Sequence, residues 1–379
     1  MKSYLVVLIL LFSQSTIFCQ KTCSIKLILI SNHLPDSVKI YITGNNRLMG
    51  NWNPAGAELN KVNDSTWEKI ISFPLNSKIE YKFTKGNWAS EALNNDKTIP
   101  GNNLLTVKND TTIFINVKYW SNKSERKITG KITGDVEYIR GLKGKGLKPR
   151  DVIIWLPPEY KNEINKRYPV LYMQDGQNII DPQTSAFGTD WGIDETADSL
   201  IKIGAIKKII VVGIYNTVDR SEEYAPGDTG NAYMNFVVNT LKPLIDKKYR
   251  TLPNPENTAV GGSSLGGLIA FMLAWDYPEV FANTVCFSPA FDIDKYNFVD
   301  SVINYNGAKK KLKIFIDIGT AGLEDSLTRG VDEMIEALND KGYKEGNELI
   351  IYKAENAKHS EYYWGMQVWR FMEFLFEKD

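Results

Sequence analysis

From about residue 132 to the end of the chain, short apolar segments alternate with longer segments of helical periodicity. The apolar segments are residues 152–156, 170–173, 209–214, 258–261, 284–287, 312–318 and 349–352. The helical segments are residues 191–203, 233–249, 265–275, 327–338 and 361–376. Such alternation builds a mostly parallel sheet with helices on both faces. Residues 132–379 are therefore predicted to form a doubly wound α/β domain.

The preceding part of the chain has a different pattern, of short alternating segments separated by turn residues. These segments are residues 25–30, 38–43, 67–73, 79–83 and 112–117. The pattern predicts a small antiparallel β-sandwich over residues 20–120. Residues 121–131 are polar and charged without apolar periodicity, and they are expected to be a linker.

The first 19 residues are predicted to be a signal peptide. Lys2 precedes an apolar run at residues 4–12, which is followed by small polar residues. That run is too short for a bilayer, which needs about 20 apolar residues. Cleavage after Cys19 is expected to export the mature chain to the periplasm, the exterior or the cell surface. A lipid anchor on Cys19 is the alternative, and bulky Phe18 disfavours it.

Charge and composition exclude several classes of function. The 45 Lys and Arg residues balance 45 Asp and Glu residues, so no basic excess is present to bind nucleic acid. Three cysteines and two histidines offer neither a disulfide framework nor the spacing of a zinc site. The chain is therefore expected to need no metal or organic cofactor, and not to be an integral membrane protein.

Residues Gly262-Ser263-Ser264-Leu265-Gly266 fit the pattern G-x-S-x-G between a predicted strand and a predicted apolar helix. A serine on such a strand-to-helix turn adopts a strained backbone conformation that leaves room only for small neighbours. Gly262 and Gly266 supply that room. The context predicts that Ser264 is the nucleophile of a nucleophile elbow.

A serine hydroxyl needs a base within hydrogen-bond reach, and the base is most often histidine. His33 lies in a loop-like segment of the first domain, whereas His359 follows the last predicted strand. His359 is therefore predicted to be the base, in the order serine, acid, histidine.

The acid is expected on the loop after the strand at 312–318. Asp325 is the first choice and Glu324 the second, because the residues themselves do not separate these neighbours. The oxyanion is expected to meet two backbone N–H groups. One belongs to Leu265, and the other to Gln177 in the loop after the strand at 170–173.

The second domain resembles the esterase D family of α/β-hydrolases, which includes feruloyl, acetyl-xylan and enterochelin-type esterases and mycolyltransferases. The residues that carry the resemblance are Met173 to Asn178, Val212 to Ile214, Arg220, Glu223-Tyr224, Tyr249 to Thr251, Gly262 to Gly267, His359 and Trp364. Feruloyl-esterase-like relatives place the acid in an Asp-Ser-Leu motif, which favours Asp325. Mycolyltransferases use glutamate, so Glu324 stays open.

The first domain resembles a starch-binding module of carbohydrate-binding family 20. The matching residues are Gly50 to Pro54, Trp67, Glu80 to Phe83 and Trp88. The resemblance implies an α-glucan platform made of Trp52, Lys82 and Trp88, where indole rings pack on sugar faces. A sandwich that only packs on the catalytic domain is the alternative.

The sequence thus predicts an exported serine ester hydrolase that acts through an acyl-enzyme. Its substrate is expected to be an acetyl or feruloyl type of ester, of or near a polysaccharide. Acyl transfer to a sugar hydroxyl and a non-catalytic glycan-binding protein are the alternatives. Asn216, Arg220, Glu223 and Tyr224 follow a central predicted strand and are expected to line the site.

Overall fold

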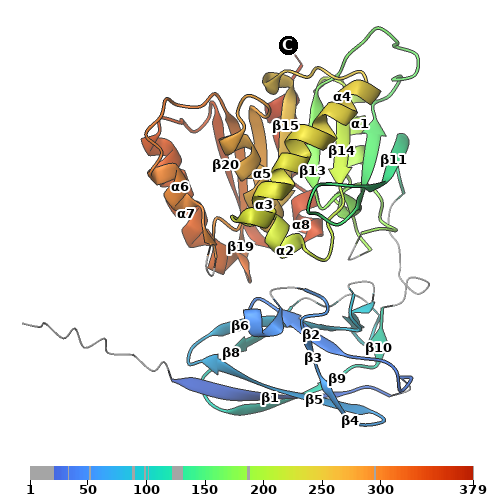
Figure 1. Ribbon diagram of the computed structural model, residues 1–379, viewed down its shortest axis with the longest axis vertical. Coiled ribbons are helices and arrows are strands. Elements are labelled where there is room, and N and C mark those ends of the chain that lie inside the picture. Colours follow the sequence, from blue (N-terminus) through green and yellow to red (C-terminus); the bar gives the residue numbers. More distant parts are fainter. Residues whose placement is uncertain are drawn as a thin grey trace, which may run out of the picture. The chain divides into compact units, whose positions relative to one another are not determined.

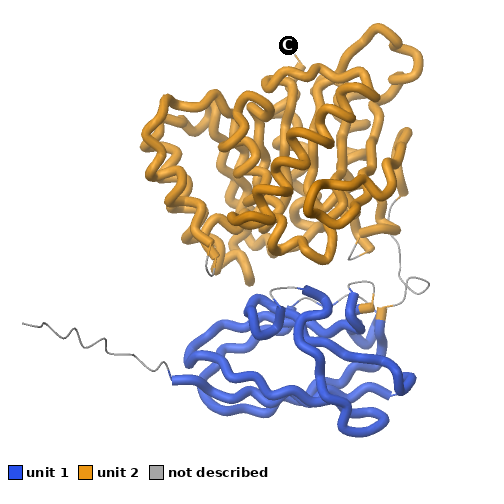
Figure 2. Tube along the Cα trace, viewed as in Figure 1, with its two compact units in different colours: residues 1–87, 91–120 blue, residues 88–90, 121–379 orange. Residues whose placement is uncertain are grey.

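The computed structural model describes residues 21–378 apart from residues 33, 51–52, 88–89, 98–99, 101, 122–130, 186–187 and 294–295. The chain divides into two compact units (Figure 2). One contains residues 1–87 and 91–120, and the other residues 88–90 and 121–379. Among the described residues, no helix combines the length and the apolar character that crossing a membrane requires.

The N-terminal unit contains two four-stranded sheets. Their strand orders are β4-β5-β1-β9 and β3-β2-β6-β8, and a short pair joins β10 to β7. The elements are β1 (Thr22–Ile30), β2 (Tyr41–Gly44), η1 (Arg47–Met49), β3 (Ala57–Glu58), β4 (Asn60–Asn63), β5 (Thr66–Pro74), β6 (Lys78–Thr84), β7 (Ala92–Leu93), β8 (Asn103–Thr106), β9 (Thr111–Asn116) and β10 (Tyr119–Trp120).

A single apolar core fills this unit. Alternate residues of β1, among them Ile25, Leu27 and Leu29, face inward and pack with Trp67 of β5 and Phe83 of β6. This is the alternation that a strand with one covered face produces. The β-sandwich is confirmed with one difference, since β1 and β9 pair in parallel and the domain is not purely antiparallel.

The C-terminal unit is built on an eight-stranded sheet of order β11-β12-β14-β13-β15-β16-β19-β20 (Figure 1). From β14 to β20 all neighbours pair in parallel, whereas β12 is antiparallel to both β11 and β14. The strands are β11 (Asp135–Leu142), β12 (Arg150–Leu156), β13 (Val170–Gln174), β14 (Ile210–Ile214), β15 (Thr258–Ser263), β16 (Asn283–Phe287), β19 (Lys313–Ala321) and β20 (Leu349–Lys358).

Helices cover both faces of this sheet. They are α1 (Ile193–Lys202), α2 (Arg220–Glu223), α3 (Asp228–Phe236), α4 (Lys242–Lys248), α5 (Leu265–Asp276), α6 (Val299–Ile303), α7 (Glu324–Asp340), α8 (Glu361–Gly365) and α9 (Val368–Phe376). Shorter elements are η3 (Gly176–Asn178), a π-turn η4 (Val237–Leu241), η5 (Pro255–Asn257) and the hairpin of β17 (Asp292–Ile293) and β18 (Tyr296–Asn297).

Two apolar clusters show which helices pack on which face. Residues of α3, α4, α5, α6 and α7 share one cluster, and residues of α1 and α9 share the other. In Figure 1, α3 and α5 cross in front of the strands. Every residue from Gly266 to Trp275 in α5 is buried, so this helix lies in the interior of its layer. The predicted α/β-hydrolase fold is confirmed.

The carboxyl ends of the parallel strands meet at one edge of the sheet, where ligands of such sheets bind. Asp175 follows β13, Asn216 closely follows β14 and Ser264 follows β15. At the same edge, Ser288 follows β16 and His359 follows β20. This topology brings residues far apart in sequence to one place.

Candidate active site

Ser264 stands between the last residue of β15 and the first residue of α5. Its backbone has φ 57° and ψ −124°, a conformation that costs a non-glycine residue of the order of 1–3 kcal/mol. Three backbone hydrogen bonds hold it. The Ser264 N–H donates to the Phe287 carbonyl at 2.9 Å, and the Ser264 carbonyl accepts from Leu268 at 3.0 Å and from Ala290 at 3.1 Å.

Glycines on either side of Ser264 allow this turn. A Cβ atom on Gly262 would lie 2.6 Å from the Gly266 carbonyl oxygen, which is closer than real Cβ atoms approach. A Cβ on Gly266 would lie 3.1 Å from Oδ2 of Asp175. The strand, turn and helix therefore have the geometry of a nucleophile elbow.

His359 contacts a buried carboxylate. Its Nδ1 lies 2.9 Å from Oε1 of Glu324, whose side chain is 0% exposed, and the His359 side chain is 13% exposed. The other carboxylate oxygen of Glu324 accepts a hydrogen bond from the Gly319 N–H at 3.2 Å. Both oxygens of Glu324 are thus engaged, one of them by the imidazole.

The preference for Asp325 over Glu324 is corrected by this contact. Helix α7 begins at Glu324, and successive residues of a helix point about 100° apart. Only one of the two neighbours can therefore face the sheet, and it is Glu324, whereas Asp325 is exposed. The apolar periodicity predicts a helix that begins only at residue 327, which places both acids on the preceding loop.

A chain of contacts connects His359 with the strand beside Ser264. The ring of His359 packs edge-on against Trp364, with 4.8 Å between centroids. The indole N–H of Trp364 donates to the Ser288 hydroxyl at 2.9 Å. Ser288 has φ 42° and directly follows Phe287, the acceptor of the Ser264 N–H. Within the described part of the chain, the Ser264 hydroxyl is not hydrogen-bonded to His359, and such contacts are often long before substrate binds.

The two expected oxyanion donors lie at the same edge. Leu265 is the first residue of α5, and the first N–H groups of a helix have no acceptor within that helix. Gln177 lies in the 3₁₀ turn η3 that follows β13 and Asp175. The carbonyl of Gln177 accepts from Thr184 Oγ1 at 2.8 Å, and its side-chain Oε1 accepts from the Asn216 N–H at 3.2 Å.

The residues expected to line the site divide into two kinds. Asn216 and Arg220 donate hydrogen bonds to the Asp175 carboxylate at the edge of the site. Glu223 is fully buried, and both of its oxygens accept from the equally buried Arg150, at 2.9 and 2.6 Å. Tyr224 is also buried, and its hydroxyl accepts from the Asp175 N–H at 3.3 Å. The expectation that Glu223 and Tyr224 line the site is therefore wrong.

The expected glucan platform of the N-terminal unit is described only at Lys82. Trp52 and Trp88 lie outside the described residues, as does His33. The Lys82 side chain is 7% exposed and donates to Oε2 of Glu91, which is 0% exposed, at 3.0 Å. Lys82 therefore belongs to a buried ion pair, and its place on an exposed platform is corrected.

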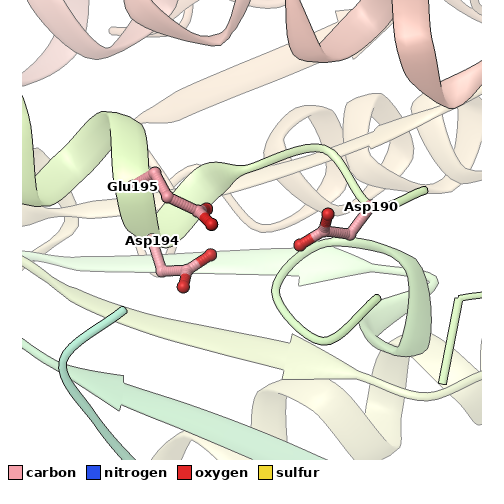
Figure 3. A group of neighbouring side chains, drawn as sticks. All are labelled: Asp190, Asp194 and Glu195. Carbon is pink, nitrogen blue, oxygen red and sulfur yellow. The ribbon is translucent and has the colours of Figure 1, made fainter. Parts of the chain in front are cut away.

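Three carboxylates form a cluster at the start of α1, namely Asp190, Asp194 and Glu195 (Figure 3). Their ligand atoms all lie within 4.8 Å of one another. Burial, followed by the charge of Glu195, raises the pKa of Asp190 to about 7. Burial, followed by a hydrogen bond to Glu195, raises the pKa of Asp194 to about 8. Carboxylates suit hard cations, but protons held by these groups relieve the same repulsion, so we assign no ion here.

A cavity of about 630 Å³ lies at the opposite edge of the sheet. Among its lining residues are Pro169, Asn257, Ala282 and Leu312, which directly precede β13, β15, β16 and β19. These are the amino ends of the strands, whereas ligands of parallel sheets bind at the carboxyl ends. The cavity is therefore separate from the candidate active site.

Comparisons with known proteins agree with the α/β-hydrolase fold. YbbA, an uncharacterised protein of Bacillus subtilis (strain 168), is 22% identical over 250 residues, which cover 61% of this chain and 94% of that protein. The endo-1,4-beta-xylanase/feruloyl esterase of Xylanibacter ruminicola is 27% identical over 199 residues, 50% of this chain and 25% of that protein. The solved structure of a ferulic acid esterase matches with a TM-score of 0.52 and 18% identity, covering 64% of this chain and 98% of that one.

Family models match both units, as the resemblances predicted. Residues 22–129 match the model described as Starch binding domain. Residues 147–378 match the model described as Putative esterase. Because that second match covers more than half of the chain, the chain belongs to the Putative esterase family.

Proposed function

We propose that the protein is a serine carboxylic ester hydrolase. Ser264 is the nucleophile, His359 the base and Glu324 the acid that orients the imidazole. The backbone N–H groups of Leu265 and Gln177 stabilise the oxyanion.

The contact between His359 and Glu324 is the observation that carries this proposal. A buried carboxylate 2.9 Å from Nδ1 keeps the proton on that nitrogen and leaves Nε2 free to accept another. The strained Ser264 turn lies at the same edge of the sheet. A buried acid, a histidine and a serine elbow together form the set of groups that acyl transfer requires.

The reaction follows from these positions. Ser264 Oγ attacks the ester carbonyl carbon while His359 Nε2 takes the hydroxyl proton. The carbonyl oxygen becomes an anion that the two N–H groups stabilise. Collapse of this intermediate releases the alcohol, which takes the proton from His359 and leaves an acyl group on Ser264. Water then repeats these steps, and the carboxylic acid leaves.

Hydrolysis of p-nitrophenyl acetate by the protein, with Ser264→Ala and His359→Ala as variants, tests the proposal. A loss of about 10³-fold or more in kcat from each change is expected, and the double variant should lose little more. His33→Ala is the matched control, because it removes the other histidine of the chain.

Activity that persists in both variants would place the chemistry elsewhere. A wild-type protein that neither hydrolyses the ester nor reacts at Ser264 with a fluorophosphonate would favour a non-catalytic glycan-binding protein. Circular dichroism of each variant separates lost chemistry from lost folding.

The natural substrate is proposed to be an ester carried on or near a polysaccharide. The match of residues 22–129 to a starch-binding model supports α-glucan binding by the N-terminal unit. The relative that shares 27% identity is named as an endo-1,4-beta-xylanase/feruloyl esterase, which supports a feruloyl type of acyl group. Affinity electrophoresis in gels that contain amylose, compared with gels that contain xylan, tests whether the protein binds α-glucan. Release of acetate or ferulate from polysaccharide, against transfer to added sugar, distinguishes hydrolase from acyltransferase.

Export is a further part of the proposal, and its basis is the apolar run at residues 4–12. Expression of the full chain in a bacterial host, followed by N-terminal sequencing of the exported protein, tests it. A mature chain that starts at Gln20 is expected, whereas a lipid-modified Cys19 would support the anchor.

A further inference from the structure

Asp175 occupies an unusual position beside the candidate oxyanion hole. It follows β13 and precedes the turn η3 that contains Gln177. Its backbone has φ 54° and ψ 44°, a left-handed conformation that glycine, asparagine and aspartate adopt more readily than other residues. Its side chain is 8% exposed. A buried carboxylate needs strong partners to persist.

Arg220 and Asn216 supply those partners. Arg220 donates from Nε to Oδ1 and from Nη2 to Oδ2 of Asp175, each at 2.7 Å. Asn216 donates from Nδ2 to Oδ1 at 2.6 Å. A bidentate pair between arginine and a carboxylate is stronger and more directional than neutral hydrogen bonds. The segment that follows β14 therefore binds Asp175, the residue that directly precedes the turn η3.

The same group of residues also touches the nucleophile helix. A Cβ atom added to Gly266 would lie 3.1 Å from Asp175 Oδ2 and 3.8 Å from Arg220 Nη2. Gly266 follows Leu265, the other expected oxyanion donor. The Asp175–Arg220 pair thus packs against the first turn of α5, so it contacts the segments that carry both donors.

Gln177 itself is tied to this loop. Its side-chain Oε1 accepts from the Asn216 N–H at 3.2 Å, and the Asn178 N–H donates to the Asp175 carbonyl at 2.8 Å. Asn216 therefore holds Asp175 with its side chain and Gln177 with its backbone. These contacts hold the Gln177 side chain and the N–H of the residue that follows it.

We infer that Asp175, Arg220 and Asn216 are positioning residues that set the distance between the two oxyanion donors. This inference rests on the proposed function. Donors must lie 2.7–3.1 Å from the oxyanion, and the loss of one donor costs about 10²–10³ in kcat. Weakening the hydrogen bonds from Arg220 and Asn216 to Asp175 should therefore lower kcat by about tenfold or more. KM should change little, because the donors act mainly in the transition state.

Arg220→Lys and Asn216→Ala test this inference. Lysine keeps the charge of arginine but cannot make the bidentate pair, and Asn216→Ala is the milder change if Arg220→Lys impairs folding. Arg140→Lys is the matched control. Arg140 donates to Asp151 at 2.6 Å in a more exposed pair between β11 and β12, and this change should leave kcat within about twofold.

Each protein is assayed with p-nitrophenyl acetate and with its thionoacetate analogue. Sulfur is a weak hydrogen-bond acceptor, so an oxyanion hole favours the oxoester. If the donors are displaced, the preference for the oxoester over the thionoester should shrink at least about fivefold in both variants. A merely structural defect lowers both rates equally and leaves the preference unchanged.

The inference would be overturned if the variants kept the wild-type preference for the oxoester, with both rates unchanged or equally lowered. This outcome leaves the proposed function intact as long as hydrolysis by the wild type depends on Ser264. If Ser264→Ala retains full activity, or the wild type cleaves neither ester, the proposed function fails and this inference fails with it. A shrinking preference in both variants, with circular dichroism unchanged and Arg140→Lys unaffected, supports it.

Discussion

The assignment of the acid gives the sharpest test of the proposed triad, through the variants Glu324→Gln and Asp325→Asn. Glutamine has the shape of glutamate, and its amide oxygen can still accept from the Gly319 N–H, as Oε2 does at 3.2 Å. What the change removes is the negative charge 2.9 Å from His359 Nδ1. During catalysis His359 becomes a cation, so the loss falls on the transition state.

The size of the effect follows from that distance. Two unit charges 2.9 Å apart attract by about 6 kcal/mol at an effective dielectric constant of 20. The amide dipole of glutamine and rearranged polar groups offset part of this attraction, so the transition state should lose about 4–5 kcal/mol of stabilisation. Because each 1.36 kcal/mol is a factor of ten, kcat should fall by about 10³–10⁴. The same exchange in a serine protease triad costs about 10⁴.

The assay is steady-state hydrolysis of p-nitrophenyl acetate, with active sites counted by phosphonate titration. Asp325→Asn is the matched control, because Asp325 is the next residue in α7 and is exposed. It should change kcat by less than about twofold. A fall of 10³ in Asp325→Asn with little effect in Glu324→Gln would refute the reasoning, and so would full activity in both.

Three further outcomes are expected from buried groups. The pKa of Asp194 is raised to about 8 from 3.8, so the folded state holds a proton that the unfolded state releases. The stability that this proton contributes is present at low pH and is lost as pH rises from about 4 to about 8. The Tm of Asp194→Asn should therefore fall less than that of the wild type over this range, and identical pH profiles would contradict this cause. Lys82→Met leaves Glu91 buried without its cation and should lower the free energy of unfolding of the N-terminal unit by about 3 kcal/mol. In urea titrations, the double variant Lys82→Met with Glu91→Leu should recover most of this lost free energy. A Lys82→Met variant as stable as the wild type would contradict a stabilising role of the ion pair. Gly262→Ala brings a Cβ to 2.6 Å from the Gly266 carbonyl, so ester hydrolysis should fall by at least about tenfold with KM little changed, whereas normal activity would show that the elbow can shift.

The central strands of the parallel sheet, β13 to β16, could be predicted because they are buried on both faces and read as continuous apolar runs. Strand β11 could not, for the opposite reason. It is an edge strand in which the charged residues Asp135, Glu137 and Arg140 are exposed. Charged side chains protect the edges of sheets, and the same charges make the segment resemble a loop.

In the N-terminal unit, segments later in the chain bury a residue that the family resemblance places on an exposed platform. The sequence of β6 places Glu80 and Lys82 on the face opposite Ile79, Tyr81 and Phe83, and the resemblance implies that Lys82 lies on a glucan platform. In the structure all residues of β6 after Lys78 are buried. Glu91, nine residues further along the chain, pairs with Lys82. Burial of the polar face depends on these later segments, which the local pattern does not reveal.

The candidate site shows the same division between local and distant determinants. The serine elbow is specified within six residues, so its pattern is readable. The orientation of His359 depends instead on Glu324, 35 residues away, and on Trp364, which is anchored to Ser288 across 76 residues. Whether Glu324 or Asp325 reaches the imidazole depends on where α7 begins, and a shift of one residue would rotate the other carboxylate inward. Short motifs therefore identify the reacting groups, while the tertiary contacts that hold them decide which of two adjacent acids can serve.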